Sequence, residues 1–489
     1  MERTCTYRVQ LHPGFTFDDA AAIVPYLAGL GVTHLYCSPY LQAQAGSTHG
    51  YDVVDHSRIN VELGGDAGHA RLVAALAAHG LGHILDIVPN HMARDGRANR
   101  WWWDVLENGP VSRYASYFDI DWEGGENKDE ATVLIPVLGD QYGRVLEAGE
   151  LRVERAGGAF VVRYSEHELP ISPRSIDELL SAAAERTGAG QLAELAERFG
   201  ALPHARRTDP AAVADRHRRK GELVETLAQA CAEQSQVAAA IDAELALLNA
   251  DADALDNLLD RQNYRLAFWR TASEELDYRR FFDVETLVGL RIEDPECFDA
   301  THEIPLALAQ AGVLDGLRID HVDGLRDPQG YLDRLRRAGG GVYTVVEKIL
   351  ESGEDLPAGW PVEGTSGYDF LTRVSNLFVD PAGAEAMAAC YADFTGRIET
   401  YDEVVHHAKQ QIMHDELATE LERLTRVLAA VCAGHRRHRD HTRRELRAAV
   451  RELVAAFGVY RTYVHPDRPV ADVDRSRILA AVATARRHR

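Results

Sequence analysis

The sequence has little cysteine and lacks any apolar run long enough to cross a membrane. Its 489 residues include six cysteines, which are scattered and form no CxxC pair, so they are typical of reduced, mostly buried thiols. The first residues, MERTCTYRVQL, lack the apolar stretch of a signal peptide and lead almost directly into a strand-like pattern. No segment approaches the length of a membrane span. We therefore expect a cytoplasmic protein that has no membrane partner.

The sequence also has fewer basic residues than acidic ones. Lysine and arginine number 53 against 76 aspartates and glutamates, which gives a formal net charge of −23. Phosphate backbones and anionic lipids repel such a chain, so we do not expect nucleic acid as a partner. The composition, with 46% hydrophobic and 26% charged residues, is that of an ordinary folded protein. A chain of this length should hold a large domain with insertions, or several domains.

The first ninety residues alternate between short apolar strands and amphipathic helices. We expect strands at 6–11, 32–37 and 83–88, and helices at 18–30 and 66–79. Strand, helix and strand at this spacing imply parallel pairing. Barrels and doubly wound sheets place their sites at the carboxyl ends of parallel strands. Polar residues that follow each strand are therefore candidate site residues.

The alternation is interrupted once and then resumes, which predicts four parts: 1–91, 92–280, 281–380 and 381–489. The second part begins with β-like runs at 131–139 and 160–164 and continues as a helical stretch to about residue 269. It is too long for a connecting loop, so we interpret it as a β-rich insertion followed by a helical one. The third part contains expected strands at 316–320, 342–347 and 364–370, and the fourth is helical.

Residues 314–324, LDGLRIDHVDG, place Arg318 and Asp320 two positions apart at the end of an expected strand. Alternate residues of a strand point to the same side, so the two side chains share a face. Two interpretations are open at this point: a structural Arg–Asp pair, or the rim of an active site. The neighbouring strand ends in Glu347, and the strand at 83–88 is followed by Asn90 and His91.

Asp320 and Glu347 would face one cleft from adjacent parallel strands, as glycosidic chemistry requires. One carboxylate attacks the anomeric carbon while a second, protonated one donates to the leaving oxygen, at a separation of roughly 5 Å in retaining enzymes. Arg318 would keep Asp320 ionised and oriented. A metal site is the competing explanation, but no HExxH or other tight ligand spacing occurs, so we expect neither a metal nor another cofactor.

Motifs in order along the whole chain resemble the α-amylase superfamily: HGYDVVD (49–55), DIVPNH (86–91), GLRIDHVDG (316–324) and VVEKIL (345–350). Further stretches, such as YRRFFDV (278–284) and FGVYRTYV (457–464), resemble its maltooligosyltrehalose synthase family. The resemblance implies a (β/α)8 TIM-type barrel with large β-rich and helical insertions. Residues 1–91 would carry strands one to three, 92–280 the insertions, and 281–380 strands four to six.

The resemblance implies a retaining, intramolecular transglucosylation that turns the reducing-end α-1,4 link of a maltodextrin into an α,α-1,1 link, for trehalose biosynthesis. Asp320 would be the nucleophile and Glu347 the general acid and base. The substrate-binding residues would be His49, Tyr51, Asp52, Asn90, His91, Arg318 and Asp323. Asp323 could equally well close the turn. A maltooligosyltrehalose trehalohydrolase would be the functional partner. The insertion 92–280 would exclude water, and its Trp101, Trp102 and Trp103 would pack in a core or stack on glucose.

One departure from the family pattern is a missing third carboxylate, an Asp after a His at the end of strand seven. His414-Asp415 has the right letters but lies in a helical stretch, so we set it aside. Strands seven and eight and a C-terminal β domain have no counterpart. We expect an incomplete barrel that is inactive or unstable unless the missing part is supplied in trans. An amylase-type hydrolase and a non-catalytic maltodextrin-binding remnant are the alternatives.

Overall fold

The centre of the fold is a parallel sheet of six strands. The computed structural model describes residues 4–94, 96–122 and 132–488. Within them the strand order is β1-β2-β5-β14-β15-β16, and every neighbouring pair is parallel. The bounds are Thr6–Val9 for β1, His34–Cys37 for β2, Gly82–Ile87 for β5, Gly316–Ile319 for β14, Tyr343–Val346 for β15 and Gly364–Thr365 for β16.

Helices alternate with these strands along the chain. They are α1 (Phe17–Gly29), α2 (Gly65–His79), α11 (Pro295–Gln310) and α12 (Pro328–Ala338), and α13 (Tyr368–Asn376) follows the last strand. The strands follow one another in chain order, as in the wall of a barrel, whereas a doubly wound sheet reverses its order at a switch point. The fold is therefore part of a TIM-type (β/α)8 barrel. It is open between β1 and β16 in the part of the chain that the structure describes.

The predicted alternation is confirmed, with one strand corrected. The segment 364–370 is extended only at Gly364 and Thr365. Gly367 adopts a left-handed conformation (φ 109°) that ends the extended run, and α13 begins at the next residue. In its first turn Asp369 accepts a hydrogen bond from the Thr365 hydroxyl, which fixes the start of the helix. The strand predicted at 364–370 is therefore only two residues long.

Between β5 and β14 the chain leaves the barrel. A β-rich part holds β6 (His91–Ala93), α3 (Arg100–Asn108), β7 (Val133–Leu138), α4 (Tyr142–Glu147), β8 (Arg152–Ala156), β9 (Ala159–Tyr164) and β10 (His167–Pro170). Residue 131, the first of a predicted β-like run, lies outside the described residues. The helical part holds α5 (Asp177–Thr187), α6 (Gly190–Gly200), α7 (Pro210–Glu233), α8 (Ser235–Leu248) and α9 (Ala252–Leu259). The chain returns through β11 (Tyr264–Phe268), α10 (Ala272–Glu275), β12 (Arg280–Phe281) and β13 (Val284–Gly289).

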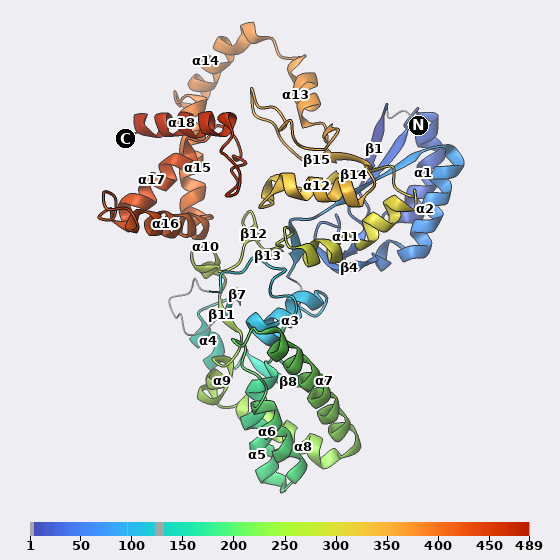
Figure 1. Cartoon of the computed structure of the whole chain (residues 1–489), viewed down its shortest axis with the longest axis vertical. Coiled ribbons are helices and arrows are strands. Elements are labelled where there is room, and N and C mark those ends of the chain that lie inside the picture. The colour runs from blue at the N-terminus through green and yellow to red at the C-terminus, as the bar shows by residue number, and fades with distance from the viewer. Residues whose placement is uncertain (1–3, 95, 123–131, 489) are drawn as a thin grey trace.

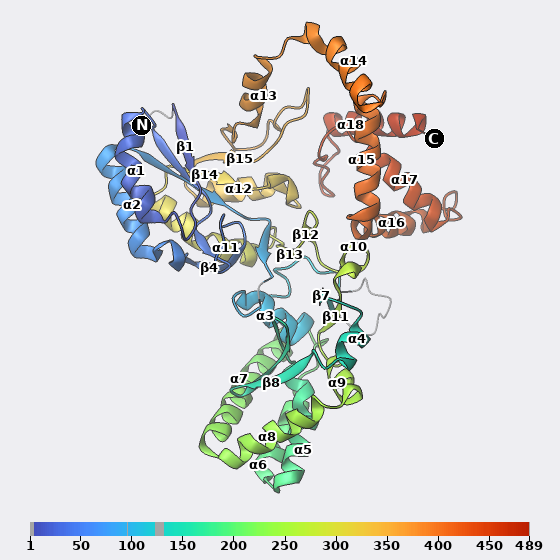
Figure 2. The same ribbon diagram turned by 180° about the vertical axis from the view of Figure 1, so that it is seen from behind.

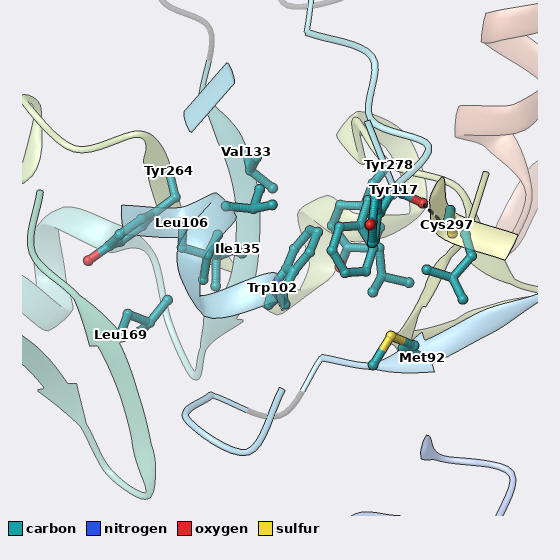
Figure 3. Close-up of a cluster of buried hydrophobic side chains, with 14 of the residues drawn as sticks. Met92, Trp102, Leu106, Tyr117, Val133, Ile135, Leu169, Tyr264, Tyr278 and Cys297 are labelled. Atoms are coloured by element: carbon teal, nitrogen blue, oxygen red, sulfur yellow. Dashed lines mark hydrogen bonds between the residues drawn. The ribbon is translucent and has the colours of Figure 1, made fainter. Parts of the chain in front are cut away.

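The buried residues of the insertion are continuous with those of the barrel, and Trp102 is one of them. Its indole is fully buried and makes edge-on contacts with Phe118 and Tyr278. Figure 3 shows Trp102 and Tyr278 among the buried side chains. Trp101 stacks on His56 and Tyr114 instead. Core packing, one of the two predictions for this tryptophan run, therefore describes Trp102. The helices α5–α8 lie far from the barrel strands in both views (Figures 1 and 2), and exclusion of water by the insertion stays a prediction.

The last part of the chain is helical, as predicted. It holds α14 (Ala384–Thr395), α15 (Tyr401–Asp415), α16 (Ala418–Ala433), α17 (Arg443–Ala455) and α18 (Asp472–Arg487). His414 and Asp415 end α15, in agreement with setting them aside as a strand-end motif. Neither α13 nor α14 buries any of its residues, and large apolar side chains stand exposed along both helices. No helix among the described residues is both long and apolar enough to span a membrane. The division of the chain at 91, 280 and 380 stays a prediction.

Candidate active site

Arg318 is the centre of the candidate site. The register pairs it with Asp86 on β5, so the two side chains emerge side by side from adjacent strands. Its Nη1 donates to Asp86 Oδ1 at 2.8 Å and to Asp320 Oδ1 at 2.7 Å. Its Nη2 forms an ion pair of 3.1 Å with Glu347 Oε1. One guanidinium thus gathers the two predicted catalytic carboxyls and a third one, Asp86.

Asp86 is completely enclosed by donors. The hydroxyls of Tyr36 and Tyr51 each donate to its Oδ2 at 2.7 Å, in addition to the bonds from Arg318. Arg8 in turn donates to the Tyr51 hydroxyl at 3.2 Å. Burial raises the pKa of Asp86, and Arg318 opposes this shift. This full set of donors fits an ionised carboxylate, which holds the Arg318 guanidinium in place through its hydrogen bonds.

The site holds more negative than positive charge. Asp86, Asp320 and Glu347 contact one guanidinium, so three ionised carboxylates would leave two charges uncompensated. Burial raises the pKa of Asp320 to about 8, although Arg318 opposes the shift. The cluster therefore retains a proton near neutral pH. Among the described residues no group of three or more His, Cys, Asp or Glu side chains is arranged to hold a metal ion.

Glu347 follows β15 and reaches toward the turn after β14. Its main-chain N–H donates to the Ile319 carbonyl at 2.8 Å, which continues the pairing of the two strands. Its Oε2 accepts a hydrogen bond of 2.9 Å from the main-chain N–H of His321. His321 is in the left-handed region (φ 41°), which is uncommon for a residue with a side chain. A quarter of the Glu347 side chain is exposed, so it can reach a bound ligand.

His91 and Asn90 follow β5, and both side chains contact other protein groups. The His91 ring is 1% exposed, and its Nε2 lies 3.2 Å from the Tyr51 carbonyl oxygen. Burial lowers the pKa of His91 to about 3, so the ring is neutral in the physiological range. Asn90 Oδ1 accepts from Arg279 at 2.6 Å. The ring of Phe281 packs against that of His91, with 4.6 Å between the ring centroids. Contact between His91 and a sugar stays a prediction.

The loop before β4 (Val53–Ile59), which pairs with β3 (Leu41–Ala43), carries the other predicted ligand-binding residues. His49 is nearly half exposed, and its Nδ1 accepts the Tyr51 main-chain N–H at 3.1 Å. Asp52 is mostly buried and accepts a hydrogen bond from the Ser47 hydroxyl. Gly50 lies against the Pro39 carbonyl, and a Cβ there would come within 2.2 Å of that oxygen. The loop is therefore fixed, and the His49 side chain is more exposed than that of Asp52.

Asp323 is engaged on both carboxylate oxygens. Lys348 Nζ lies 2.9 Å from Oδ2, and the Tyr463 hydroxyl donates to Oδ1 at 2.5 Å. The carboxylate also lies in the turn after Asp320, so of its two predicted roles this geometry favours closing the turn. Contact with sugar hydroxyls would require one of these partners to give way.

Several residues of the site were not predicted from the sequence. Tyr36 and Arg8 lie inside β2 and β1, and the register pairs them with each other. A polar or aromatic residue within a short strand is the signal, but it does not indicate which face points inward. Arg279 and Lys348 lie in stretches already noted as motifs, YRRFFDV and VVEKIL. Their charge beside a predicted strand end was available as a signal.

The chain is similar to known proteins over most of its length. Residues 21–144 match the α-amylase catalytic domain family. A putative maltooligosyl trehalose synthase of Mycobacterium tuberculosis is 35% identical over 463 residues, which are 93% of this chain and 48% of that protein. The structure of maltooligosyltrehalose synthase from Arthrobacter ramosus is 36% identical, with a TM-score of 0.73 over 99% of this chain and 50% of that one.

A shorter match is to a malto-oligosyltrehalose trehalohydrolase of Rhizobium sp., 31% identical over 115 residues, which are 24% of this chain and 19% of that protein. This chain spans about half the length of the curated synthase and of the solved synthase that it matches. Both the sequence identity and the fold of those proteins extend over nearly all of the present chain.

Proposed function

The chain belongs to the α-amylase superfamily, as a relative of the maltooligosyltrehalose synthases, and we propose that its strand-end carboxyls serve an intramolecular transglucosylation of maltodextrins. The observation that carries the proposal is the convergence of Asp320 and Glu347 on the two arms of the Arg318 guanidinium. Two carboxyls held this close in unlike surroundings suit the retaining chemistry of α-glucan enzymes. We propose that an α-1,4 link at the reducing end becomes an α,α-1,1 link.

The reaction proceeds in two displacements. Asp320 attacks the anomeric carbon of the penultimate glucose, and Glu347 gives its proton to the O4 of the leaving terminal glucose. The freed glucose stays and attacks the covalent intermediate through its own anomeric hydroxyl, while Glu347 takes up that proton. The bond to Asp320 breaks, and no water is consumed. Tyr51, His49, Asp52, Asn90 and His91 are proposed to bind sugar hydroxyls.

The chemistry of the product defines the partner. A maltodextrin capped by an α,α-1,1 link has no reducing end, so a hydrolase that releases trehalose, such as a malto-oligosyltrehalose trehalohydrolase, is the proposed next enzyme. A cytoplasmic location remains part of the proposal, since all six cysteines are free thiols.

A reducing-end assay on maltopentaose tests the proposal. Because the chain spans about half the length of its relatives, the assay has two arms. One uses the chain alone, and the other adds the part of the Arthrobacter ramosus synthase that this chain does not match. We expect loss of reducing ends without new glucose in the second arm. Asp320→Asn and Glu347→Gln should abolish it, and Asp393→Asn on exposed α14 should not.

Amylase-type hydrolysis is the second candidate, because Glu347 is a quarter exposed and open to water. It would raise the number of reducing ends through the same two carboxyls. Maltodextrin binding by calorimetry without any product in either arm would instead support a binding role and contradict the proposed reaction.

A further inference from the structure

A short segment late in the chain contacts the turn that follows Asp320. We name residues 460–463 the clasp and residues 320–325 the nucleophile turn. The Tyr460 hydroxyl lies 3.0 Å from His321 Nε2. Arg461 Nη1 donates to the carbonyls of Asp323 and Leu325, at 2.8 and 2.5 Å. The clasp therefore reaches the turn across about 140 residues of sequence.

The nucleophile turn fixes the position of Glu347 as well as that of Asp320. His321 has its left-handed conformation in this turn, and that conformation directs its N–H at Glu347 Oε2. A left-handed residue with a side chain persists only where its surroundings hold it. Here the ring of His321 is held between Phe281, Phe282 and Tyr460. A relaxed turn would take the donor away from Glu347.

Lys348, the residue after Glu347, completes the connection. It is fully buried, and its Nζ binds Asp323 Oδ2 at 2.9 Å and Glu354 Oε1 at 3.1 Å. The opposite oxygen of Asp323 accepts from Tyr463 in the clasp. One carboxylate therefore joins the clasp, the nucleophile turn and the segment that carries Glu347.

We propose that Arg461 and Tyr463 are positioning residues, which hold the nucleophile turn so that Asp320 and the His321 N–H keep their places relative to Glu347. The proposal builds on the proposed function, whose two carboxyls it positions. Ordinary packing between a loop and the barrel is the competing explanation. The clasp differs from ordinary packing because its donors meet two carbonyls and one carboxylate of a single turn. Catalytic groups displaced by about 1 Å can lose on the order of 100-fold in rate.

Amide hydrogen exchange tests the clasp independently of activity. In the nucleophile turn, the N–H of Gly324 donates to the His321 carbonyl and that of Leu325 to the Val322 carbonyl. We expect Tyr463→Phe and Arg461→Met to raise exchange in a peptide covering 320–325 by about tenfold or more, with β2 and β5 unchanged. Tyr391→Phe, at an exposed position on α14, is the matched control. Unchanged exchange in 320–325 would overturn the proposal.

Tyr463→Phe removes only the hydroxyl that binds Asp323. If Arg461→Met prevents folding, Tyr463→Phe alone still tests the clasp. Kinetics then separate positioning from stability, in whichever arm of the maltopentaose assay shows turnover. We expect Tyr463→Phe to lower kcat about tenfold or more, to leave KM within about twofold, and to shift the pH profile. Arg461→Lys should recover part of what Arg461→Met loses, since it keeps a donor. A lowered Tm with unchanged kcat and pH profile would show packing alone. Absence of turnover by the parent chain in both arms counts against the proposed function, while the exchange result still decides on the clasp.

Discussion

The Tyr36 hydroxyl donates a 2.7 Å hydrogen bond to Asp86, and this pair lies beneath the charged centre of the candidate site. Asp86 thereby accepts from two tyrosines and from Arg318, which fixes the guanidinium that Asp320 and Glu347 share. The position of Arg318 therefore depends on the buried Asp86. Tyr36→Phe removes one of the hydroxyls that bind Asp86.

Tyr36→Phe should lower the free energy of unfolding by about 1.5–3 kcal/mol, the usual value of a hydrogen bond to a charged group. The ring stays, so packing is unchanged and the loss comes from the donor. Urea unfolding at neutral pH measures it. Tyr26→Phe is the control, since Tyr26 is largely exposed on α1. Equal stability of the Tyr36 variant and the parent would contradict the anchoring role of Asp86.

Arg318→Met should be far more damaging, because it leaves the three carboxyls of the site without their cation. Breaking a buried ion pair by removing one partner costs about 3–5 kcal/mol. The deficit should shrink toward pH 5, where the carboxyls take up protons. Urea unfolding at pH 5 and pH 7 measures both effects. Adding Asp86→Asn should recover part of the loss at pH 7; a deficit independent of pH would show that packing, rather than charge, is responsible.

The raised pKa of Asp320 makes a prediction about stability. The folded chain holds this proton up to about pH 8, whereas the ordinary pKa is 3.8. The stability that this group contributes is therefore complete below the ordinary pKa and is lost as the pH rises through about 8. Asp320→Asn should gain stability over the parent as the pH rises from 5 to 8, by thermal unfolding. A flat difference for Asp320→Asn would contradict the shift.

The same shift makes a prediction about turnover. A nucleophilic carboxylate must be ionised, so the acid limb of kcat/KM, which reports the free enzyme, should lie near pH 8 if Asp320 is the nucleophile. Rates of the competent mixture with maltopentaose between pH 5 and pH 9 measure the limb. A limb near pH 4 would mean that Arg318 already keeps Asp320 ionised in the free enzyme.

The sequence predicted the strand-end carboxyls because parallel pairing places successive strand ends at one edge. Arg318, Asp320 and Glu347 meet for that reason. Tyr36 and Arg8 were missed because β1 and β2 are short, and alternation alone does not assign the inner face. Tyr460 and Tyr463 lie in the stretch FGVYRTYV, but no local pattern indicates that they contact a turn about 140 residues earlier. His91 was placed at the right end of its strand, but only the structure shows its ring occupied by Tyr51 and Phe281.

The exposed apolar surface on α13, α14 and the segment between them makes a prediction for the chain in isolation. Phe378 and Phe394 are 83% and 88% exposed, and Leu377 and Met387 are also exposed. Exposed apolar side chains that gather in this way bind hydrophobic dyes and promote association. The double variant Phe378→Ser and Phe394→Ser should lower dye fluorescence by about half or more. Because neither ring is buried, the free energy of unfolding should change by less than about 0.5 kcal/mol.

Leu247→Ser is the matched control, because Leu247 is exposed on α8, far from α13 in both views. It should leave the dye signal almost unchanged, which assigns the binding to α13 and α14 rather than to scattered apolar side chains. If the unmatched part of the Arthrobacter ramosus synthase suppresses the dye signal of the parent chain, this surface is one that the added polypeptide covers. Equal dye binding by the double variant and the parent would show that α13 and α14 pack against other parts of the chain in solution.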